Sequence, residues 1–341
     1  YSKSHDLKNL LIQFNNALDN RGPDYRSFYL NENNNFGMSH TRLSIIDLSQ
    51  NGNQPMEDYL GNWVISYNGE IYNHLEIRNY LTKKFKDKIK WKSSSDTETI
   101  LMSNIILGFK KTLELLEGMF AFALYNKNEN QLFIARDRMG EKPLYYYHKE
   151  NIFIFGSDIS VFKKVKNLNF QIDDKILPQY LQTGCIKAPN SIYKNIKKLE
   201  PGFYLKLFNN FSVLEKQNYW SLKNIVEKSE NINQISEENF LIEKNKLKKL
   251  IESTVIKQTI SDVQIGSFLS GGVDSSLISS IMSKYSKNKI KTFTVGFNNK
   301  NYDESKQAKN ISQHINSDHY EYFMSKKELV DTVNKLHLIY N

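Results

Sequence analysis

The sequence is almost free of cysteine and has no long apolar run. Cys185 is the one cysteine among 341 residues, which excludes an internal disulfide and a cysteine-based zinc site. Such sparing use of cysteine is typical of the reducing cytoplasm, where we expect the protein to lie. The eighteen or so consecutive apolar residues of a membrane-spanning helix do not occur, so we expect no membrane partner.

The first residues, YSKSHDLKNL, lack the apolar stretch of a signal peptide and also an initiator methionine. We therefore expect no secretory signal in these residues, and an incomplete start.

A long basic block is also missing, although the net charge is +9. The lysines are spread along the chain between asparagine and glutamate residues, which is typical of a solvated surface. A nucleic-acid-binding surface would gather its charge on one face, so we expect no nucleic-acid partner. Apolar residues make up 40% and charged residues 24%, which indicates a globular protein long enough for two domains.

The first part of the sequence alternates between strand-like and helix-like patterns. A β-rich stretch at 63–67 (WVISY) ends at Asn68 and Gly69, a pair that favours a turn. Residues 97–107 carry apolar side chains at helical spacing. Two hairpins are predicted by pairs of apolar runs, over 119–125 with 131–135 and over 145–147 with 152–155. Antiparallel strands mixed with helices predict an α+β domain.

The second part begins after a polar, aperiodic stretch at 209–238, which reads as a linker. A helical pattern follows, with apolar residues at Phe240, Leu247, Leu250, Ile251 and Val255. The opening of a parallel α/β sheet is then predicted by a strand at 263–269, a glycine-rich loop at 270–276, a helix at 277–284 and a strand at 292–297. Two strands do not complete such a domain, so we expect it to be truncated. We place the first domain at 1–208 and the second at 239–341.

The glycine-rich loop, SGGVDSS, has the chemistry of a phosphate-binding loop. Gly271 and Gly272 allow the backbone to approach a ligand closely, and the following helix offers free N–H groups to an anion. Asp274 would repel phosphate unless a cation lay between them, which implies Mg²⁺. The lysine of a Walker loop is absent. The alternative is a plain glycine turn in which Asp274 caps the helix.

This loop resembles the pyrophosphate loop of the ATP-pyrophosphatase family, whose members adenylate a carboxylate or carbonyl group and release pyrophosphate. The stretches TFTVGF at 292–297 and YDES at 302–305 resemble its asparagine synthetase branch. The resemblance implies that Phe268 and Val295 flank the adenine, although relatives mostly have an aliphatic residue at the first position. The implied ATP-binding residues are Phe268, Ser270, Gly271, Gly272, Asp274, Ser275, Ser276 and Val295, with Asp274 as the metal ligand.

Five motifs in the first part resemble one family when they are taken in order. They are RGPD at 21–24, TRLSIID at 41–47, NGEIYNH at 68–74, SSDTE at 94–98 and RDRMGEKPLYYY at 136–147. Each is weak alone, but together they resemble the N-terminal-nucleophile glutaminase domain of glutamine-hydrolysing asparagine synthetases. The resemblance implies a four-layer αββα sandwich, followed by a truncated α/β ATP-pyrophosphatase domain that is similar to adenine nucleotide α-hydrolases.

The same resemblance assigns roles in glutamine hydrolysis. Cleavage of an amide needs an oxyanion hole, and the family uses the asparagine side chain and the glycine N–H of NGE, here Asn68 and Gly69. Glutamine also carries an α-carboxylate, which an arginine fork can hold in bidentate fashion, and an α-ammonium group, which needs anions. The implied glutamine-binding residues are Arg42, Ser44 and Ile45 on one loop, together with Glu70 and Asp96.

Two departures from the family pattern stand out. Asn20 precedes RGPD where relatives usually have histidine. The family's nucleophile is a cysteine at the mature N-terminus, whose own α-amine is the base, whereas the printed sequence starts with Tyr1. Cys185 cannot replace it because an interior residue has no free α-amine, and we interpret Cys185 as a small buried hydrophobe. We expect the chain as printed to be inactive.

The resemblance implies two coupled reactions in the intact protein. The glutaminase releases ammonia from glutamine. The synthetase uses ATP and Mg²⁺ to convert aspartate into a β-aspartyl adenylate, which ammonia attacks to give asparagine. Adenylation is required because a carboxylate is a poor electrophile. The expected partners are the small molecules glutamine, aspartate and ATP, and a homodimer is compatible with this function.

Two alternatives remain open from the sequence. A related amidotransferase would amidate another carboxylate, such as a sugar acid or a peptide. A non-catalytic protein would keep only its glutamine and nucleotide sites. The absent nucleophile favours the second alternative, whereas the presence of Arg42, Asn68, Gly69, Asp96 and Asp274 opposes it.

Overall fold

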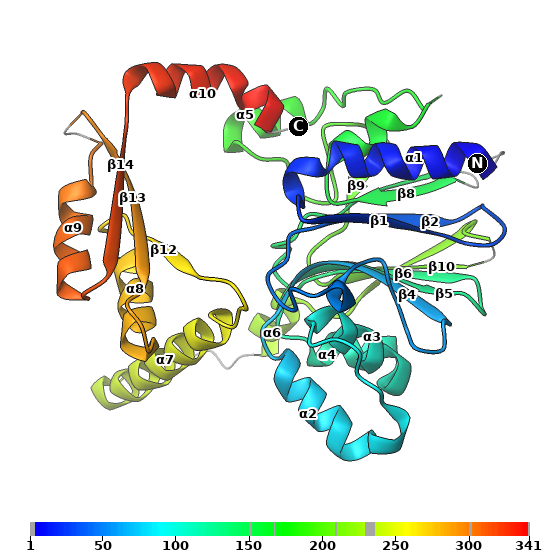
Figure 1. Ribbon diagram of the computed structural model, residues 1–341. Helices are drawn as coiled ribbons and strands as arrows, with labels where there is room; N and C mark the ends of the chain where they lie inside the picture. Colours follow the sequence, from blue (N-terminus) through cyan, green and yellow to red (C-terminus); the bar gives the residue numbers. More distant parts are fainter. Residues whose placement is uncertain are drawn as a thin grey trace. The chain divides into compact units, whose positions relative to one another are not determined.

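The computed structural model describes residues 4–149, 152–166, 168–208, 210–228, 236–299 and 302–339. The chain folds into two compact units, Tyr1–Ser229 and Glu230–Asn341, and each has sheets of its own (Figure 1). Within the described part of the chain, no helix has the length and apolar character needed to cross a membrane.

A six-stranded antiparallel sheet forms the centre of the first unit, in the order β11-β10-β6-β5-β4-β3. Its strands are β3 (Met56–Glu57), β4 (Trp63–Ile71), β5 (Gly118–Asn126), β6 (Gln131–Arg136), β10 (Phe203–Phe208) and β11 (Val213–Asn218). Side chains alternate between the faces of a strand, and β5 buries both faces. Phe120 and Phe122 pack on the helix side, and Ala121 and Ala123 on the opposite side. This burial on two sides explains the unbroken apolar run in β5.

Three helices cover one face of this sheet (Figure 1). They are α2 (His74–Phe85), α3 (Asp96–Leu107) and α4 (Phe109–Leu115). Each helix turns its apolar face to the core between helices and sheet, where Ile77, Leu101 and Leu113 are buried. The helix predicted at 97–107 is confirmed by α3, which begins where the Ser95 side chain accepts a hydrogen bond from the Thr97 N–H.

Two smaller sheets cover the opposite face. One pairs β1 (Tyr25–Leu30) with β2 (Gly37–Arg42), and the other has the order β8-β7-β9, with β7 (Tyr145–Lys149), β8 (Ile152–Gly156) and β9 (Ile196–Lys198). Helix α1 (Ser4–Ala17) covers their outer side, where Phe14 packs against a cluster that includes Ile154. The order helix, sheet, sheet, helix confirms the predicted four-layer sandwich. Both predicted hairpins are also confirmed, as β5–β6 and β7–β8.

Short helices complete the first unit. They are η1 (Asp19–Arg21), η2 (Gln50–Gly52), η3 (Lys86–Lys88), η4 (Ile159–Lys164), α5 (Leu177–Thr183) and α6 (Leu222–Lys228).

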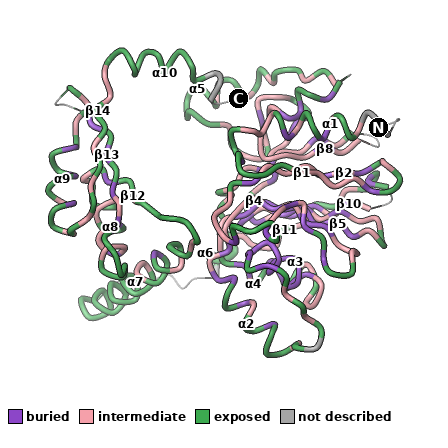
Figure 2. Tube along the Cα trace, in the orientation of Figure 1, coloured by how far each residue is buried: buried purple, intermediate pink, exposed green. Residues whose placement is uncertain are grey.

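The second unit contains a parallel sheet in the order β12-β13-β14. Its elements are α7 (Glu237–Gln258), β12 (Gly266–Phe268), α8 (Val273–Tyr285), β13 (Lys291–Phe297), α9 (Ser305–His314), β14 (Asp318–Met324) and α10 (Lys326–Ile339). The parallel α/β prediction is confirmed, and β14 adds a strand that the sequence pattern had not indicated. The predicted helix at the start of this unit exists as α7, but only Val255 of its apolar residues is buried. Figure 2 shows most of α7 as exposed.

The predicted linker at 209–238 holds secondary structure. β11 pairs with β10 along its whole length, and α6 follows it. Most β11 side chains lie in solvent because the strand is at the edge of its sheet; its polar sequence therefore resembled a linker. Residues 209 and 229–235 of the predicted linker lie outside the described residues, and the domain limits at 208 and 239 stay predictions.

The predicted turn at Asn68 and Gly69 is wrong. β4 continues to Ile71, with Asn68 opposite Ala121 and Gly69 opposite Phe120 on β5. A Cβ atom on Gly69 would lie 2.2 Å from the carbonyl oxygen of Met119. Glycine here permits close approach of two strands rather than a bend.

Replacement of Gly69 by alanine should therefore destabilise the first unit. The added methyl group would push β4 from β5, at a cost of roughly 1–3 kcal/mol, as for other overpacked positions. The three tryptophans, Trp63, Trp91 and Trp220, all lie in this unit. Denaturant unfolding followed by tryptophan fluorescence will therefore measure the change.

Lys83→Ala is the control, since Lys83 is an exposed position of α2 in the same unit. Equal unfolding midpoints for the Gly69 variant and the unmodified chain would contradict the steric argument.

Candidate functional site

A cavity of about 470 Å³ lies in the first unit. It is lined by β2, β4, the loop after β2 and the start of α3. Of the predicted glutamine-site residues, the structure brings six together on its wall: Arg42, Ile45, Asn68, Gly69, Glu70 and Asp96. Ser44 is not among the lining residues, and its N–H donates to the Asp24 carboxylate at 2.7 Å. The individual roles of these residues remain predictions.

The side chains of β4 alternate between two faces, and one of these faces forms the floor of the cavity. Tyr67 and Ile71 point to the core beneath the helices. Ser66, Asn68 and Glu70 therefore project from the opposite face, toward the second sheet layer. The sequence NGE thus places an amide and a carboxyl side chain on one wall, with a glycine between them.

The outer edge of β4 presents backbone N–H groups at alternate residues. The Tyr67 N–H donates to Gln54 Oε1 at 2.7 Å, and the Ile71 N–H donates to Asp96 Oδ2 at 2.9 Å. In an antiparallel ladder, residues two apart point their N–H groups to the same side. The Gly69 N–H therefore points outward between these two occupied positions.

The pairing partner of Gly69 supports this orientation. Phe120 stands opposite Gly69, but its N–H donates to Asp137 Oδ2 at 3.2 Å and its carbonyl accepts from the Asp137 N–H at 2.8 Å. Phe120 thus directs both groups away from β4, so its pair with Gly69 is not hydrogen-bonded. The Gly69 N–H is consequently not used in the β4–β5 ladder, which is what an oxyanion donor requires.

Asp96 is a buried carboxylate at the first residue of α3. Its Oδ2 accepts from the Tyr67 hydroxyl at 2.7 Å as well as from the Ile71 N–H. Burial raises the pKa of Asp96, and these hydrogen bonds oppose the rise. The carboxyl is fixed against β4 and contributes negative potential to the cavity.

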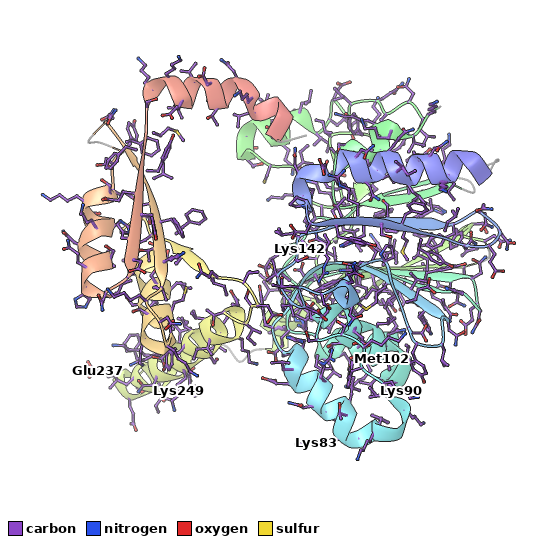
Figure 3. The ribbon with its side chains drawn as sticks, viewed as in Figure 1. Lys83, Lys90, Met102, Lys142, Glu237 and Lys249 are labelled. Atoms are coloured by element: carbon purple, nitrogen blue, oxygen red, sulfur yellow. The ribbon has the colours of Figure 1, made fainter. Side chains whose placement is uncertain are left out.

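Glu70 places a second carboxyl in the same cavity. Burial raises its pKa to about 8, repulsion from Asp96 adds to the rise, and Lys142 opposes it. Lys142, labelled in Figure 3, also lines the cavity. Two carboxyl groups in a poorly solvated cavity are stabilised in their ionised forms by an adjacent cation, such as an ammonium group.

Arg42 is more constrained than the sequence suggested. Its Nη1 donates to the Ser49 carbonyl and to Asn53 Oδ1, both at 2.9 Å. Its Nη2 donates to the carbonyls of Ile46, at 3.3 Å, and Asp47. Four of the five guanidinium N–H groups are thus engaged by one loop. The predicted bidentate fork is not available in this arrangement, although the positive charge still faces the cavity.

A loop stabilised by Asp137 also borders the cavity. Its carboxylate accepts from the N–H groups of Met139, Glu141 and Lys142, at 3.0, 2.9 and 3.0 Å, in addition to that of Phe120. This wrapping positions Lys142. The motif at 136–147 had indicated the family, but not this role. In the sequence, this loop is indicated only by an aspartate that precedes a polar stretch containing glycine.

The predicted phosphate loop in the second unit has the expected local geometry. α8 begins at Val273 with Gly272 as its N-cap, so the alternative in which Asp274 caps the helix is wrong. Gly271 has φ +85°, and a Cβ there would lie 2.8 Å from the Gln307 Cβ. By comparison, a Cβ on Gly272 would have only the Ser270 Oγ nearby, at 3.4 Å, so the space next to Gly272 is open.

The predicted ATP-binding residues do not form an enclosed site within this unit. The side chains of Phe268 and Val295 are 81% and 45% exposed. The predicted set lines neither the 470 Å³ cavity nor a second cavity of about 400 Å³ near Lys309 and His319. Among the residues that the structure describes, no cluster of three or more His, Cys, Asp or Glu could hold a metal ion. A single carboxylate, that of Asp274, is compatible with magnesium, because this ion is commonly held by one or two carboxylates together with phosphate oxygens.

Cys185 is exposed, so its interpretation as a buried hydrophobe is wrong. It follows the left-handed Gly184 that ends α5, on the surface. Its Sγ lies 3.8 Å from the Thr183 hydroxyl. It does not line the cavity of the first unit.

The raised pKa of Glu70 predicts a pH-dependent stability. The folded state holds the Glu70 proton up to about pH 8, whereas an unfolded chain releases it near pH 4.5. The stabilisation is therefore present below about pH 4.5 and is lost as the pH rises to about 8. Glu70→Gln has no proton to lose at this position, so its stability does not change in this way with pH. The melting temperature of the variant minus that of the unmodified chain should therefore be roughly 5 °C larger at pH 8.5 than at pH 5.5.

Melting monitored by tryptophan fluorescence at the two pH values measures this difference. Glu129→Gln is the control, because its carboxyl lies in solvent. If the melting temperatures of the Glu70 variant and the unmodified chain differ by the same amount at both pH values, the burial argument is contradicted.

Comparison with known proteins agrees with these two units. The family described as "Glutamine amidotransferase domain" matches residues 1–220, and the family described as "Asparagine synthase" matches residues 246–341. The putative asparagine synthetase (glutamine-hydrolyzing) 2 of Methanocaldococcus jannaschii is 34% identical, over 98% of this chain and 65% of its own length.

Two further relatives show the range of the similarity. The asparagine synthetase (glutamine-hydrolyzing) 1 of Bacillus subtilis is 31% identical, over 98% of this chain and 50% of its own. The amidase chry2 of Gibberella zeae is 31% identical, over 82% of this chain and 40% of its own. The chain thus spans at most about two thirds of these curated relatives. It belongs to the glutamine-hydrolysing asparagine synthetase family and joins a glutamine amidotransferase domain to an asparagine synthase domain.

Proposed function

We propose that this chain forms the glutaminase and part of the synthetase of an enzyme that makes asparagine from aspartate, glutamine and ATP. The observation that carries the proposal is the single cavity that gathers Asn68, Gly69, Glu70, Asp96 and Arg42. This set offers donors for an amide oxygen, anions for an ammonium group and a cation for a carboxylate. Glutamine presents all three groups.

In this proposal, the Gly69 N–H and the Asn68 side-chain amide stabilise the oxygen of the amide under attack. The Gly69 donor is not used in the β4–β5 ladder and is fixed by the strand, so little reorganisation is needed. The α-ammonium lies against Glu70 and Asp96. Its arrival would lower the pKa of Glu70, because an adjacent cation favours the ionised carboxyl.

The α-carboxylate of glutamine lies on the Arg42 side of the cavity. Since four guanidinium N–H groups hold the loop at 46–53, we propose that Arg42 contributes its charge and at most its Nε–H. Backbone N–H groups near Ile45 would supply the remaining hydrogen bonds. This differs from a bidentate arginine clamp, and the structure of the loop is the reason.

The second unit is proposed to hold ATP at the loop 270–276. The N-terminus of α8 offers N–H groups and a positive partial charge to phosphate. A magnesium ion would neutralise phosphate charge, with Asp274 as its protein ligand. Ammonia would then attack a β-aspartyl adenylate to give asparagine and AMP. The similarity to an amidase supports a second candidate, in which a different carboxyl-derived group is the substrate.

A polypeptide made of residues 1–341 alone should not release glutamate from glutamine, because the proposed nucleophile is a cysteine with a free α-amine and the interior Cys185 has none. Addition of a leader strand that begins with cysteine should restore glutamate release. A leader beginning with alanine is the matched control, and Cys185→Ser in the active protein should change nothing. Glutamate is measured by a coupled dehydrogenase assay. Release by the unextended chain above background would overturn this account of the nucleophile.

Asp274→Asn in an extended, complete protein should abolish pyrophosphate release that depends on aspartate, because the phosphates lose their metal bridge. Glutamate release should stay nearly intact, since the glutamine cavity belongs to the other unit. Both products are measured side by side. Asp318→Asn, an exposed acid in the same unit, is the control.

Three results would count against the proposal. Normal pyrophosphate release by the Asp274 variant would remove the metal role. Equal loss of both activities would indicate misfolding, in which case Asp274→Glu must restore part of the pyrophosphate release. Pyrophosphate that depends on another carboxylate, and not on aspartate, would favour the second candidate.

A further inference from the structure

Asp47 connects the two sides of the glutamine cavity. It is buried, with φ +57°, in the loop after β2. Its Oδ1 accepts from the Ser49 N–H at 3.1 Å and from the Ser49 hydroxyl at 2.5 Å. Its Oδ2 accepts from the Ser94 N–H at 2.8 Å. The same residue is thus bound within its own loop and to the segment before α3.

The Arg42 side of this connection is held by hydrogen bonds from the guanidinium group. The Asp47 carbonyl and the Ser49 carbonyl both accept from the Arg42 guanidinium. A displacement of Asp47 would therefore move the acceptors that hold Arg42.

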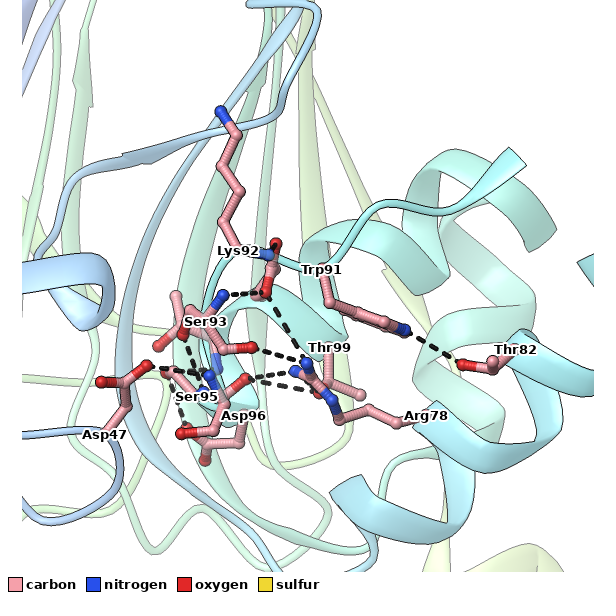
Figure 4. Close-up of polar contacts among 12 residues, drawn as sticks. Asp47, Arg78, Thr82, Trp91, Lys92, Ser93, Ser95, Asp96 and Thr99 are labelled. Carbon is pink, nitrogen blue, oxygen red and sulfur yellow. Dashed lines mark hydrogen bonds and ion pairs between the residues drawn. The ribbon is translucent and has the colours of Figure 1, made fainter. Parts of the chain in front are cut away.

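The other side carries Asp96, two residues beyond Ser94. This segment is fixed by further charged groups: Arg78 donates to the carbonyls of Ser93 and Ser95, at 2.6 and 3.2 Å. Glu98 accepts from the Ser93 N–H at 2.9 Å. Figure 4 shows Asp47 on one side of this network and Arg78 on the other. Asp47 is its link to the Arg42 loop.

The ionised form of Asp47 is the one that makes this link. Burial alone would raise the pKa of Asp47, but hydrogen bonds from Ser49, Ser93 and Ser94 outweigh it and lower the pKa to about 2. As a carboxylate, Asp47 accepts on both oxygens; as an amide, it would place an N–H₂ group against one of these donors.

We infer that Asp47 is a positioning residue, which sets the spacing between the Arg42 loop and Asp96 and so makes the cavity selective for α-amino acids. The inference rests on the proposed function. A ligand that carries a carboxylate and an ammonium group on one carbon must meet both sides at once, and its affinity depends on their spacing. The affinity of a ligand with only one of these groups does not depend on that spacing.

The test compares three ligands with the 341-residue chain, by saturation-transfer NMR titration. L-glutamine carries both groups, glutaramate lacks the ammonium group, and 4-aminobutyramide lacks the carboxylate. Asp47→Asn should weaken glutamine binding about tenfold, the size expected for losing charged hydrogen bonds. It should leave the two single-charge ligands within about twofold.

Two further variants keep the test decisive. Ser49→Ala removes one hydrogen bond to Asp47 but keeps its charge, and should give the same pattern with a smaller loss. Asp58→Asn is the matched control: Asp58 is also buried and accepts two backbone hydrogen bonds, from Leu60 at 3.2 Å and Trp63 at 2.7 Å, but both donors lie between the end of β3 and the start of β4.

The outcomes separate this inference from the function on which it rests. If the Asp47 and Ser49 variants bind all three ligands less well by the same factor, the role is merely structural and the inference is wrong. If they bind glutamine as the unmodified chain does, it is also wrong. If the unmodified chain does not bind glutamine, the proposed function fails, and the inference fails with it.

Discussion

A carboxylate removed from water must be met by donors, or its burial costs several kcal/mol. Asp96 imposes this requirement on the first unit. The Tyr67 hydroxyl and the Ile71 N–H meet it from β4, and the start of α3 adds its partial positive charge. These contacts fix the start of α3 against β4.

The same requirement explains the electrostatics of the site. Glu70 is itself largely buried, and the nearby Asp96 repels a second negative charge, so the pKa of Glu70 is raised to about 8. Two ionised carboxyl groups this close destabilise each other in a poorly solvated cavity, and a bound cation would stabilise both. The fold holds the two groups in place through the strand register and the helix start, and neither depends on a mobile loop.

Local patterns in the sequence predicted much of the fold because the interactions concerned are local or periodic. Both hairpins, α3 and the strand–loop–helix around Gly271 follow from alternation, helical spacing and glycine chemistry. The errors arose where tertiary context decides. Asn68–Gly69 favours a turn in isolation, but pairing with β5 keeps it extended. The candidate residues came from ordered motifs, whereas Asp47 and Arg78 act through partners distant in sequence, Ser94 and Ser93, for which a single sequence gives no signal.

The loop around Asp137 has a consequence for how the chain can change. Surface loops usually accept insertions and deletions, since their backbone groups can turn to water. Here one carboxylate is met by N–H groups at fixed offsets of two, four and five residues. Adding or removing a residue would shift that count and leave a buried ion without its donors. This connection is therefore limited in length as strictly as a strand within a sheet, although it has no regular structure.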